Sequence, residues 1–202
     1  MERGMLYQIH RYPADLIDVV HVAGGRRVVI RPVLPQDEAL TGAFFRSLPA
    51  PARYDRFLTQ MRELPPGLLR RFTQVDYADH LALVAEVFEG GREVVIGEAR
   101  YVRSGEAAAE FAVSISAEWQ GKGLASMMLG KLTCRAATAG ITRMHGETLA
   151  SNEKMLRLAG KAGFTARPSP DIRGLMLLEK VIEPPRPGRI CSGMQERGTL
   201  AA

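Results

Sequence analysis

A change in hydrophobic period between residues 107 and 139 constrains the fold more than any other feature of the chain. Residues 107–116 alternate, so that Phe111, Val113 and Ile115 share one face, which is typical of a strand with one buried side. Residues 123–139 carry apolar side chains at helical spacing. The sequence therefore predicts a strand that enters a helix through the short glycine-rich segment between them.

That loop has the composition of an anion site. Gly121 and Gly123 permit positive φ angles and a close approach of the backbone to a ligand. Backbone amides at the start of a helix, with the helix dipole behind them, attract negative charge, and Lys122 adds a cation beside them. We expect a phosphate or pyrophosphate to bind here. The alternative is a glycine-rich turn that does no more than begin the helix.

Two other phosphate loops do not fit this segment. The Walker loop needs two glycines separated by four residues and followed by Lys and Ser or Thr, and no such string occurs. The dinucleotide fingerprint needs a third glycine, where this chain has Ser126. The loop is therefore neither of these nucleotide-binding motifs.

The rest of the chain mixes strands with short helices. Residues 89–92 are typical of a hairpin turn, because their two glycines reach the positive φ angles that such turns need. Residues 1–26 are a polar lead-in, and residues 182–202 have the polar, proline-rich composition of a disordered tail. We expect strands at residues 27–33, 80–88, 93–102, 107–116, 141–149, 164–167 and 173–181. We expect helices that begin near Pro35, Pro65, Gly123 and Asn152.

Composition and charge narrow the class of protein. The chain has 202 residues, 46% of them apolar and 24% charged, which is the balance of an ordinary soluble domain. No apolar run reaches 18 residues and no secretory signal pattern is present, so we expect no membrane span or export. The cysteines are Cys134 and Cys191, and in a cytoplasmic protein we expect both to be reduced thiols.

The basic residues are scattered along the chain. The net charge is +5, but no block of five Lys or Arg residues occurs, so we expect no nucleic-acid partner. A modest positive excess also suits an anionic ligand or an acidic protein surface, and it is common as ordinary surface charge.

A second sequence segment supports a specific interpretation of the glycine loop. The string Gln120-Gly121-Lys122-Gly123-Leu124-Ala125 resembles the Gln/Arg-x-x-Gly-x-Gly/Ala motif of the GNAT superfamily of acyl-CoA N-acyltransferases. About thirty residues on, Asn152 opens a helix that ends in Gly163-Phe164, similar to a second segment of that family. The resemblance covers residues 27–181. It implies an α+β (mixed α/β) fold, with a central, mostly antiparallel sheet of six to seven strands flanked by helices.

A narrower resemblance concerns segments outside the loop. They are similar to the GNAT domain of bacterial Pat-type protein lysine acetyltransferases, here standing alone without a regulatory domain. This implies transfer of acetyl from acetyl-CoA to a protein lysine, by a monomer or homodimer. The alternatives are a small-molecule N-acetyltransferase acting on polyamines or aminoglycoside-like amines, and a CoA-sensing module without catalysis. The segments are Arg11-Tyr12-Pro13, Ile30-Arg31-Pro32 with Asp37, Arg53-Tyr54 with Arg56-Phe57, residues 71–77, and residues 109–113.

The resemblance also implies a set of residues that bind acetyl-CoA. Backbone amides of the glycine loop hold the pyrophosphate, and strand amides near Val113 bond the pantetheine arm as an added strand would. Asn152 reaches the pantetheine or the departing thiolate, although a plain helix N-cap is an alternative role that is compatible with this one. The cofactor-binding residues are therefore Val113, Ser114, Ile115, Gln120, Gly121, Lys122, Gly123, Leu124, Ala125 and Asn152.

The reaction needs a base, because an acceptor lysine with a pKa of about 10.4 is protonated near pH 7. Glu110 matches the acid of the Pat-type segment, and we expect it to be partly buried, with a solvent-facing strand glutamate as the alternative. Glu147 is the second candidate. A strand amide such as that of Val113 would donate to the thioester carbonyl. Many family members protonate the thiolate with a tyrosine whose position here is Ala159, so the general acid is left to water or Asn152.

The other conspicuous residues have plainer interpretations. Cys134 has no histidine at helical spacing, so we expect a structural thiol rather than an acyl-enzyme. The four histidines show no metal-ligand spacing, and we predict no metal. Trp119 is expected to pack in the core. A basic face on the last helix suits either solvent or the phosphates of CoA, and it consists of Lys154, Arg157 and Lys161.

Overall fold

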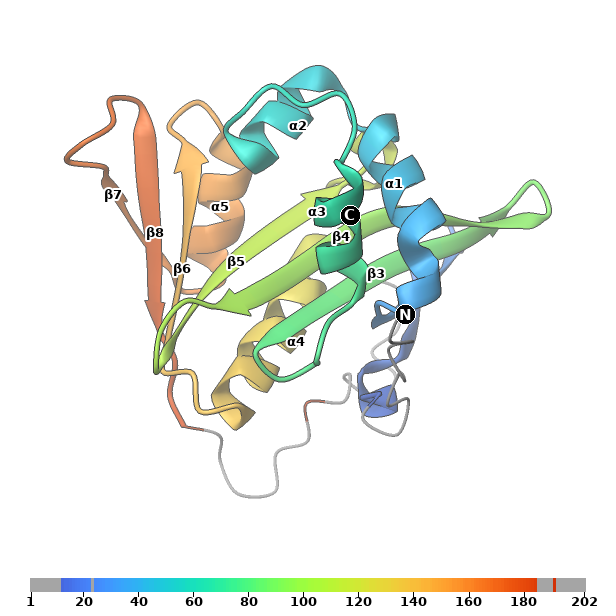
Figure 1. Ribbon diagram of the computed structural model, residues 1–202, viewed down its shortest axis with the longest axis horizontal. Coiled ribbons are helices and arrows are strands. Elements are labelled where there is room, and N and C mark those ends of the chain that lie inside the picture. The colour runs from blue at the N-terminus through green and yellow to red at the C-terminus, as the bar shows by residue number, and fades with distance from the viewer. Residues whose placement is uncertain (1–11, 23, 185–190, 192–202) are drawn as a thin grey trace, which may run out of the picture.

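A computed structural model describes residues 12–22, 24–184 and 191, and it is built around one twisted sheet (Figure 1). The eight strands of the sheet lie in the order β1-β2-β3-β4-β5-β6-β8-β7. They are β1 (Asp18–His21), β2 (Arg27–Pro32), β3 (His80–Glu89), β4 (Arg92–Arg103), β5 (Ala108–Ile115), β6 (Arg143–Leu149), β7 (Thr165–Pro168) and β8 (Leu175–Val181). Neighbouring strands are antiparallel except for β5 and β6.

Helices cover both faces of this sheet. The α-helices are α1 (Glu38–Ser47), α2 (Ala50–Phe57), α3 (Pro66–Thr73), α4 (Leu124–Thr138) and α5 (Glu153–Lys161). Single 3-10 turns occur at Ala14–Leu16, Pro35–Asp37 and Ala117–Trp119. None of the helices in the described ranges is long and apolar enough to cross a membrane.

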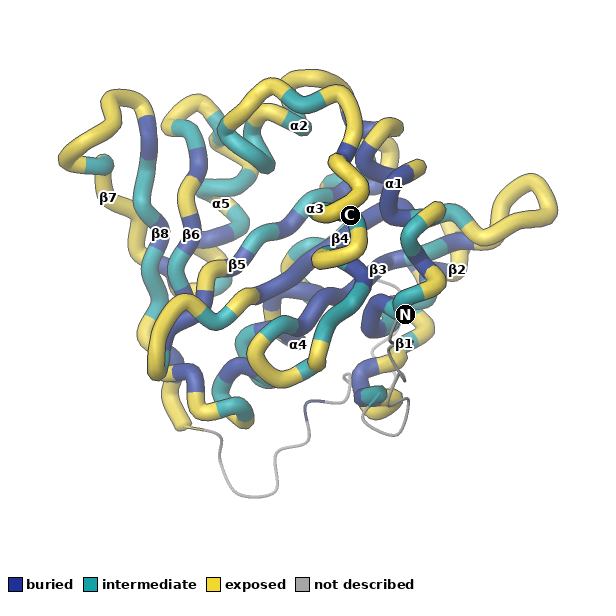
Figure 2. The backbone as a smooth tube through the Cα atoms, in the orientation of Figure 1, coloured by how far each residue is buried: buried dark blue, intermediate teal, exposed yellow. Residues whose placement is uncertain are grey.

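The alternation of the strands divides the core into two layers. Tyr101 and Phe111 pack with Met128 and Leu132 of α4 on one face of the sheet. On the opposite face, Val84 and Val95 pack with apolar residues of α1. Figure 2 shows the buried residues concentrated along the middle strands, while the tip of the β3–β4 hairpin is exposed. Gly90 and Gly91 at that tip have φ angles of 59° and 78°, as the hairpin prediction requires.

An ion-pair network joins the first part of the sheet to α1. Arg31 of β2 donates from Nη1 to Asp37 Oδ2 at 2.6 Å and from Nε to Glu86 Oε2 at 2.9 Å. The same Asp37 oxygen accepts from the backbone amide of Leu34 at 2.7 Å. The Ile30-Arg31-Pro32 and Asp37 segments of the Pat-type resemblance therefore fix where α1 begins.

The two parallel strands stay together over a short stretch only. Their pairing comprises Ala108 with Arg143, Ala109 with Met144, and Glu110 with His145. Beyond these pairs β5 continues beside β4, whereas β6 continues beside β8, so a gap opens between β5 and β6 (Figure 1). At the point of divergence Gly146 lies so close to Phe111 that a Cβ added there would stand 2.9 Å from the ring. A glycine is therefore required where the two strands separate.

The predicted fold class is confirmed, with two differences in detail. The sheet has eight strands rather than six or seven, because β1, within the residues predicted as a lead-in, pairs with β2. Helix α2 was not predicted. Residues 1–11 of the predicted lead-in lie outside the described residues, as does most of the predicted tail at 182–202. Of the tail's described residues, Ile182 and Cys191 are buried and 183–184 are exposed.

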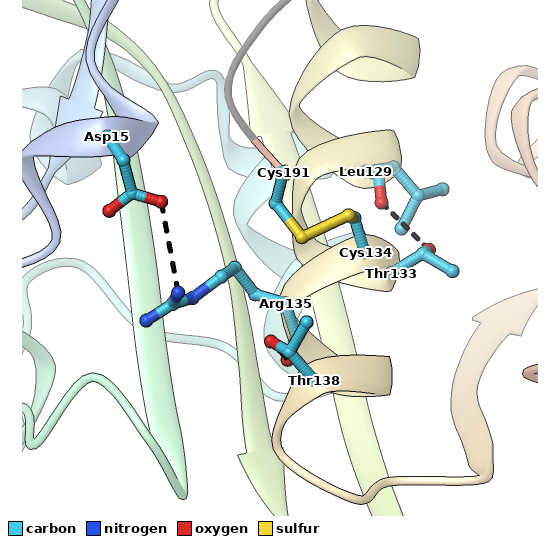
Figure 3. The surroundings of a disulfide bond; sticks show 7 residues. All are labelled: Asp15, Leu129, Thr133, Cys134, Arg135, Thr138 and Cys191. Atoms are coloured by element: carbon cyan, nitrogen blue, oxygen red, sulfur yellow. Dashed lines mark hydrogen bonds and ion pairs between the residues drawn. A yellow bond between two sulfur atoms is a disulfide. The ribbon is translucent and has the colours of Figure 1, made fainter. Parts of the chain in front are cut away.

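The prediction that both cysteines are reduced thiols is wrong in this structure. Cys134, in the middle of α4, forms a disulfide with Cys191 across 57 residues of sequence (Figure 3). The Cα atoms are 5.6 Å apart, within the range that a disulfide spans. Cys191, which lies beyond β8 in the sequence, is bonded to α4, so the fold brings together two cysteines that are far apart in the chain.

Candidate active site

The glycine-rich loop has the geometry of an anion site. Gly121 and Gly123 have φ angles of 75° and 80°, as the sequence predicted, and α4 begins at the next residue, Leu124. Within the described part of the chain, the backbone amides of residues 121–126 donate to no protein acceptor. Leu124 is buried, while Lys122 and Ala125 are half-buried. Unsatisfied amides at a helix N-terminus suit a phosphate or pyrophosphate.

Gln120 fixes this loop to the elements on either side of it. Its Nε2 donates to the carbonyl oxygen of Ile115 at the end of β5, at 2.9 Å. Its Oε1 accepts from Lys154 Nζ of α5 at 2.7 Å. Of the predicted basic face on α5, Lys154 therefore points to the loop, whereas Arg157 pairs with Glu153 one turn away at 2.9 Å.

Trp119 packs beneath the loop as expected. Its side chain is 3% exposed and belongs to the main core. The guanidinium of Arg26 lies 3.8 Å from the centre of the indole ring. The residue therefore supports the loop from the inside.

The gap between β5 and β6 exposes the backbone of alternate residues of β5. Ser104 N donates to Ala108 O, and Ser116 N donates to Ile96 O, which shows that even-numbered residues of β5 exchange hydrogen bonds with β4. The backbone groups of Val113 and Ile115 therefore point to the gap. Ser114 differs from the expectation for the pantetheine arm, because its backbone pairs with β4.

Asn152 is the N-cap of α5. Its Oδ1 accepts from the amide of Met155 at 3.1 Å, which establishes the capping role and leaves the side-chain NH2 directed to no described residue. Further along α5, Ala159 is 1% exposed and packs in the core. The position at which many family members carry a tyrosine therefore holds no hydroxyl here.

Both candidate bases lie on the face of the sheet opposite α4. Glu110 is in register with His145 across the parallel pair, so their side chains share a face, and Glu147 lies two residues further along β6 on that same face. Both glutamates are exposed. The expected partial burial of Glu110 is therefore wrong, and its exposure leaves it open to an approaching acceptor.

A charged cluster on the same face was not predicted. Glu98 and Arg100 of β4 pair with each other, and Arg100 Nη1 lies 3.0 Å from His80 Nε2. Arg100 also stacks on Phe72 of α3, with its guanidinium carbon 3.6 Å from the ring centre, and donates to the Phe72 carbonyl oxygen at 3.3 Å. The cluster therefore ties α3 to the sheet.

Burial and neighbouring charges set the ionisation of this cluster. Burial opposes ionisation of Glu98, but the charges of Arg100 and Arg56 outweigh it, and the pKa of Glu98 is lowered. Burial, followed by the charge of Arg100, lowers the pKa of His80 to about 4, so the ring is neutral near pH 7. Glu98 and Arg100 break the apolar pattern of residues 94–101, which was the signal available in the sequence.

A small pocket lies beside this cluster, under α1, α2 and α3. Glu98 and Ser114 form its polar wall on the sheet side, and Arg56 of α2 lines it from above. The remaining lining is apolar and consists of Phe44, Phe45, Leu48, Phe57, Leu64 and Phe72. Helix α2 packs against both β5 and β6, so it bridges the two strands on the face that carries Glu110.

The histidines lie apart from one another. His21 is at the end of β1, His80 begins β3, and His145 on β6 is 2.7 Å from Ser104 Oγ; His10 lies outside the described residues. Among the residues that the structure describes, no group of three or more His, Cys, Asp or Glu side chains could hold a metal ion.

Comparison with known proteins agrees with this geometry. The sequence profile described as Acetyltransferase (GNAT) domain matches residues 27–165. An acetyltransferase of Pseudomonas aeruginosa is 33% identical over 148 residues, which is 73% of this chain and 80% of that protein. The acetyltransferase Pat of Mycolicibacterium smegmatis is 34% identical over 146 residues, which is 71% of this chain but 43% of that longer protein.

A solved structure supports the same assignment. The GNAT domain of S. lividans PAT superposes with a TM-score of 0.76 at 29% identity, over 84% of this chain and 99% of that chain. The resemblance of the sequence to Pat-type GNAT domains is thereby confirmed. The chain belongs to the GNAT acetyltransferase family and is an acetyl-CoA-dependent N-acetyltransferase.

Proposed function

We propose that this enzyme acetylates lysine side chains of other proteins and that Glu110 is its general base. The observation that carries the proposal is the position of Glu110, which is exposed on β5 at the last residue before β5 and β6 separate. A base on an open face suits an acceptor lysine that a protein surface presents. An enclosed pocket would suit a small free amine better.

The unsatisfied amides of the loop fit the pyrophosphate of acetyl-CoA. We assign the pyrophosphate to the backbone of Gln120 to Ala125 and the pantetheine arm to the backbone of Val113 and Ile115, which points into the gap. Asn152 caps α5 through its side-chain oxygen, so its side-chain NH2 can donate a hydrogen bond to the same arm. This placement leaves the thioester near Val113, whose amide donates to the carbonyl oxygen as negative charge develops on it.

The reaction is a direct transfer. Glu110 takes a proton from the acceptor ammonium, either directly or through water, and the free amine attacks the thioester carbon. A C–N bond forms, the C–S bond breaks, and CoA leaves as a thiolate, while the attacking nitrogen gives up its second proton to water. Because Ala159 supplies no hydroxyl, the thiolate is protonated from water, and a thiol with a pKa near 8.5 needs little help at neutral pH.

The charges around the site favour a protein lysine over a polyamine. The carboxylates of Glu98 and Glu110 share their face with the guanidinium groups of Arg100 and Arg56. Glu147 adds a third carboxylate on this face, so the two guanidinium groups offset two of its three acids. The two cations make the face less favourable for a small polycation than a site lined by acids alone. We infer that the acceptor is recognised through contacts beyond its amine.

Glutamine substitution at Glu110 tests the role of the base. We expect Glu110→Gln to lower kcat by roughly 10²- to 10⁴-fold, the usual contribution of a general base, with unchanged affinity for CoA. Glu106→Gln, at an exposed glutamate of the β4–β5 turn, is the matched control, and Glu147→Gln tests the second candidate. A larger loss at Glu147 than at Glu110 would reassign the base.

A second experiment tests the acceptor. Labelled acetyl-CoA is incubated with the enzyme and a cell lysate, and labelled proteins are identified. Labelling of small amines alone would favour the small-molecule acetyltransferase. CoA binding with no amine-dependent release of thiol on any substrate would favour a CoA-sensing module.

A cytoplasmic location is part of this proposal, and the Cys134–Cys191 disulfide opposes it. Cytosolic thiols are generally kept reduced. Thiol labelling of the protein quenched rapidly from intact cells tests the location. Cysteines that react without prior reduction support the cytoplasm, and cysteines that react only after reduction indicate an oxidising compartment.

A further inference from the structure

Arg56 occupies a distinctive position over the acceptor face. It lies in the last turn of α2, the helix that packs against both β5 and β6. Its guanidinium carbon is 4.8 Å from the ring centre of Phe57 and 5.9 Å from that of Phe72. The side chain lines the small pocket with Glu98 and Ser114. These two rings stack on each other with their centres 6.0 Å apart, so the guanidinium lies beside an aromatic pair above the sheet.

The charge of Arg56 is not taken up by a direct ion pair. In the described ranges no carboxylate lies within salt-bridge distance of it, and Glu98 pairs instead with Arg100. Burial lowers the pKa of Arg56 to about 10, with Glu98 and Glu110 acting against that change, so the guanidinium stays charged near pH 7. His80 adds no charge at this pH, because its pKa is about 4.

The four charged groups have separable roles. Glu98 and Arg100 neutralise each other by contact and hold α3. Glu110 and Arg56 remain as an exposed carboxylate and a cation beside two aromatic rings, each within the electrostatic range of the other. Removal of Arg56 would make the acceptor face, which also carries the exposed Glu147, more negative by one charge.

We propose that Arg56 is a specificity-determining residue that excludes small polycationic amines from the acceptor site. This inference rests on the proposed function, which makes a protein lysine the acceptor. A free polyamine carries several charges close together, and each is repelled by a cation fixed over the site. A lysine on a protein brings one ammonium group and gains affinity from neighbouring contacts. Arg56 therefore acts on the polyamine more than on the lysine.

The magnitude follows from Coulomb repulsion between two cations at an effective dielectric constant near 20. Loss of one fixed cation within about 8 Å of a bound charge changes its affinity by roughly tenfold or more. For spermidine, Arg56→Gln should raise kcat/KM at least tenfold relative to kcat/KM for a peptide with one lysine. Because the effect is electrostatic, it should shrink as salt concentration rises.

The experiment compares the wild type and four variants on both acceptors at low and high salt, with thiol release as the readout. Arg56→Gln carries the test, and Arg56→Lys should retain the wild-type preference. Arg56→Met keeps an apolar stem beside the rings and tests the same loss of charge if Arg56→Gln folds poorly. Arg46→Gln, at an exposed arginine of α1, is the control for a change in net charge. An unchanged spermidine-to-peptide ratio in folded Arg56→Gln or Arg56→Met overturns the inference.

A separate result distinguishes failure of the proposed function from failure of the inference about Arg56. A wild type that acetylates no lysine peptide overturns the protein-acceptor proposal. The inference about Arg56 is then decided by calorimetric titration of spermidine into the wild type and Arg56→Gln, both with CoA present. Binding at least tenfold tighter to the variant supports it, and equal binding refutes it.

Discussion

His80 should make the stability of this enzyme depend on pH. Its Nε2 lies 3.0 Å from Arg100 Nη1, and since arginine always donates, the nitrogen accepts and the ring is neutral. Its own backbone amide donates to Asp76 Oδ1 at 2.9 Å. Burial comes first among the causes that lower the pKa of His80, the charge of Arg100 second, and the resulting pKa is about 4.

The sign and size of the effect follow from that pKa. Between its ordinary value of 6.5 and about 4, the unfolded chain binds a proton that the native protein does not bind, so stability falls as the pH falls. The full difference corresponds to about 3 kcal/mol, at about 1.4 kcal/mol per pKa unit. Most of it, roughly 2.5 kcal/mol, should be lost between pH 7 and pH 4.5.

Urea unfolding of the wild type and of His80→Gln across this range measures the effect. Glutamine keeps an oxygen that can accept from Arg100 but does not titrate, so the stability advantage of the wild type over the variant should fall by roughly 2.5 kcal/mol. Glu98, whose pKa is lowered by the charges of Arg100 and Arg56 against the effect of burial, also weakens the native state in acid, but it is present in both proteins. His21→Gln, at an exposed histidine, is the control. A difference that stays constant with pH would refute the reasoning.

Three other substitutions test the loop, the strand gap and the disulfide. Gly121→Ala places a Cβ on a residue with φ of 75°, at a cost of about 1–2 kcal/mol, and should raise the KM for acetyl-CoA more than it lowers kcat; an unchanged KM would contradict the anion site. Gly146→Ala places a Cβ 2.9 Å from the ring and 3.1 Å from the carbonyl oxygen of Phe111, so thermal unfolding should show a loss of about 2 kcal/mol. An unchanged thermal stability of Gly146→Ala would show that β5 and β6 can move apart there without cost, against the close packing of Gly146 on Phe111. Cys134→Ser, or reduction of the wild type, should lower the free energy of unfolding in urea by about 4 kcal/mol, because the bond to Cys191 closes a loop of 57 residues; a wild type insensitive to reductant would show that the bond does not form in solution.

The sequence predicted those parts of the fold that local chemistry determines. The positive φ angles of Gly121 and Gly123 and the start of α4 follow from residue type and period alone. The alternation of residues 107–116 predicted which side chains of β5 are buried. In each case the governing interactions lie within a few residues of one another, so the pattern is visible in the chain.

What the sequence did not show depends on contacts between distant segments. Helix α2 has no fully buried residue, so it lacks the apolar stripe by which a helix is recognised, and its role comes from packing across β5 and β6. The Cys134–Cys191 bond joins positions 57 residues apart. Glu98 is tolerated inside the apolar strand β4 because Arg100 and Arg56 approach it, and Arg56 comes from another part of the chain.

Strand β5 serves three purposes at once, and its alternation keeps them separate. Phe111 and Val113 turn their side chains to the core under α4, while Glu110 and Ser114 turn theirs to the acceptor face. The backbone of the odd-numbered residues points to the gap, where the pantetheine arm is proposed to lie. A shift of the strand by one residue would bury Glu110 and expose Phe111. Gly146 packs against Phe111 directly after the last β5–β6 pair. The position of the proposed base relative to the proposed thioester site therefore depends on strand register rather than on the flexibility of the loop.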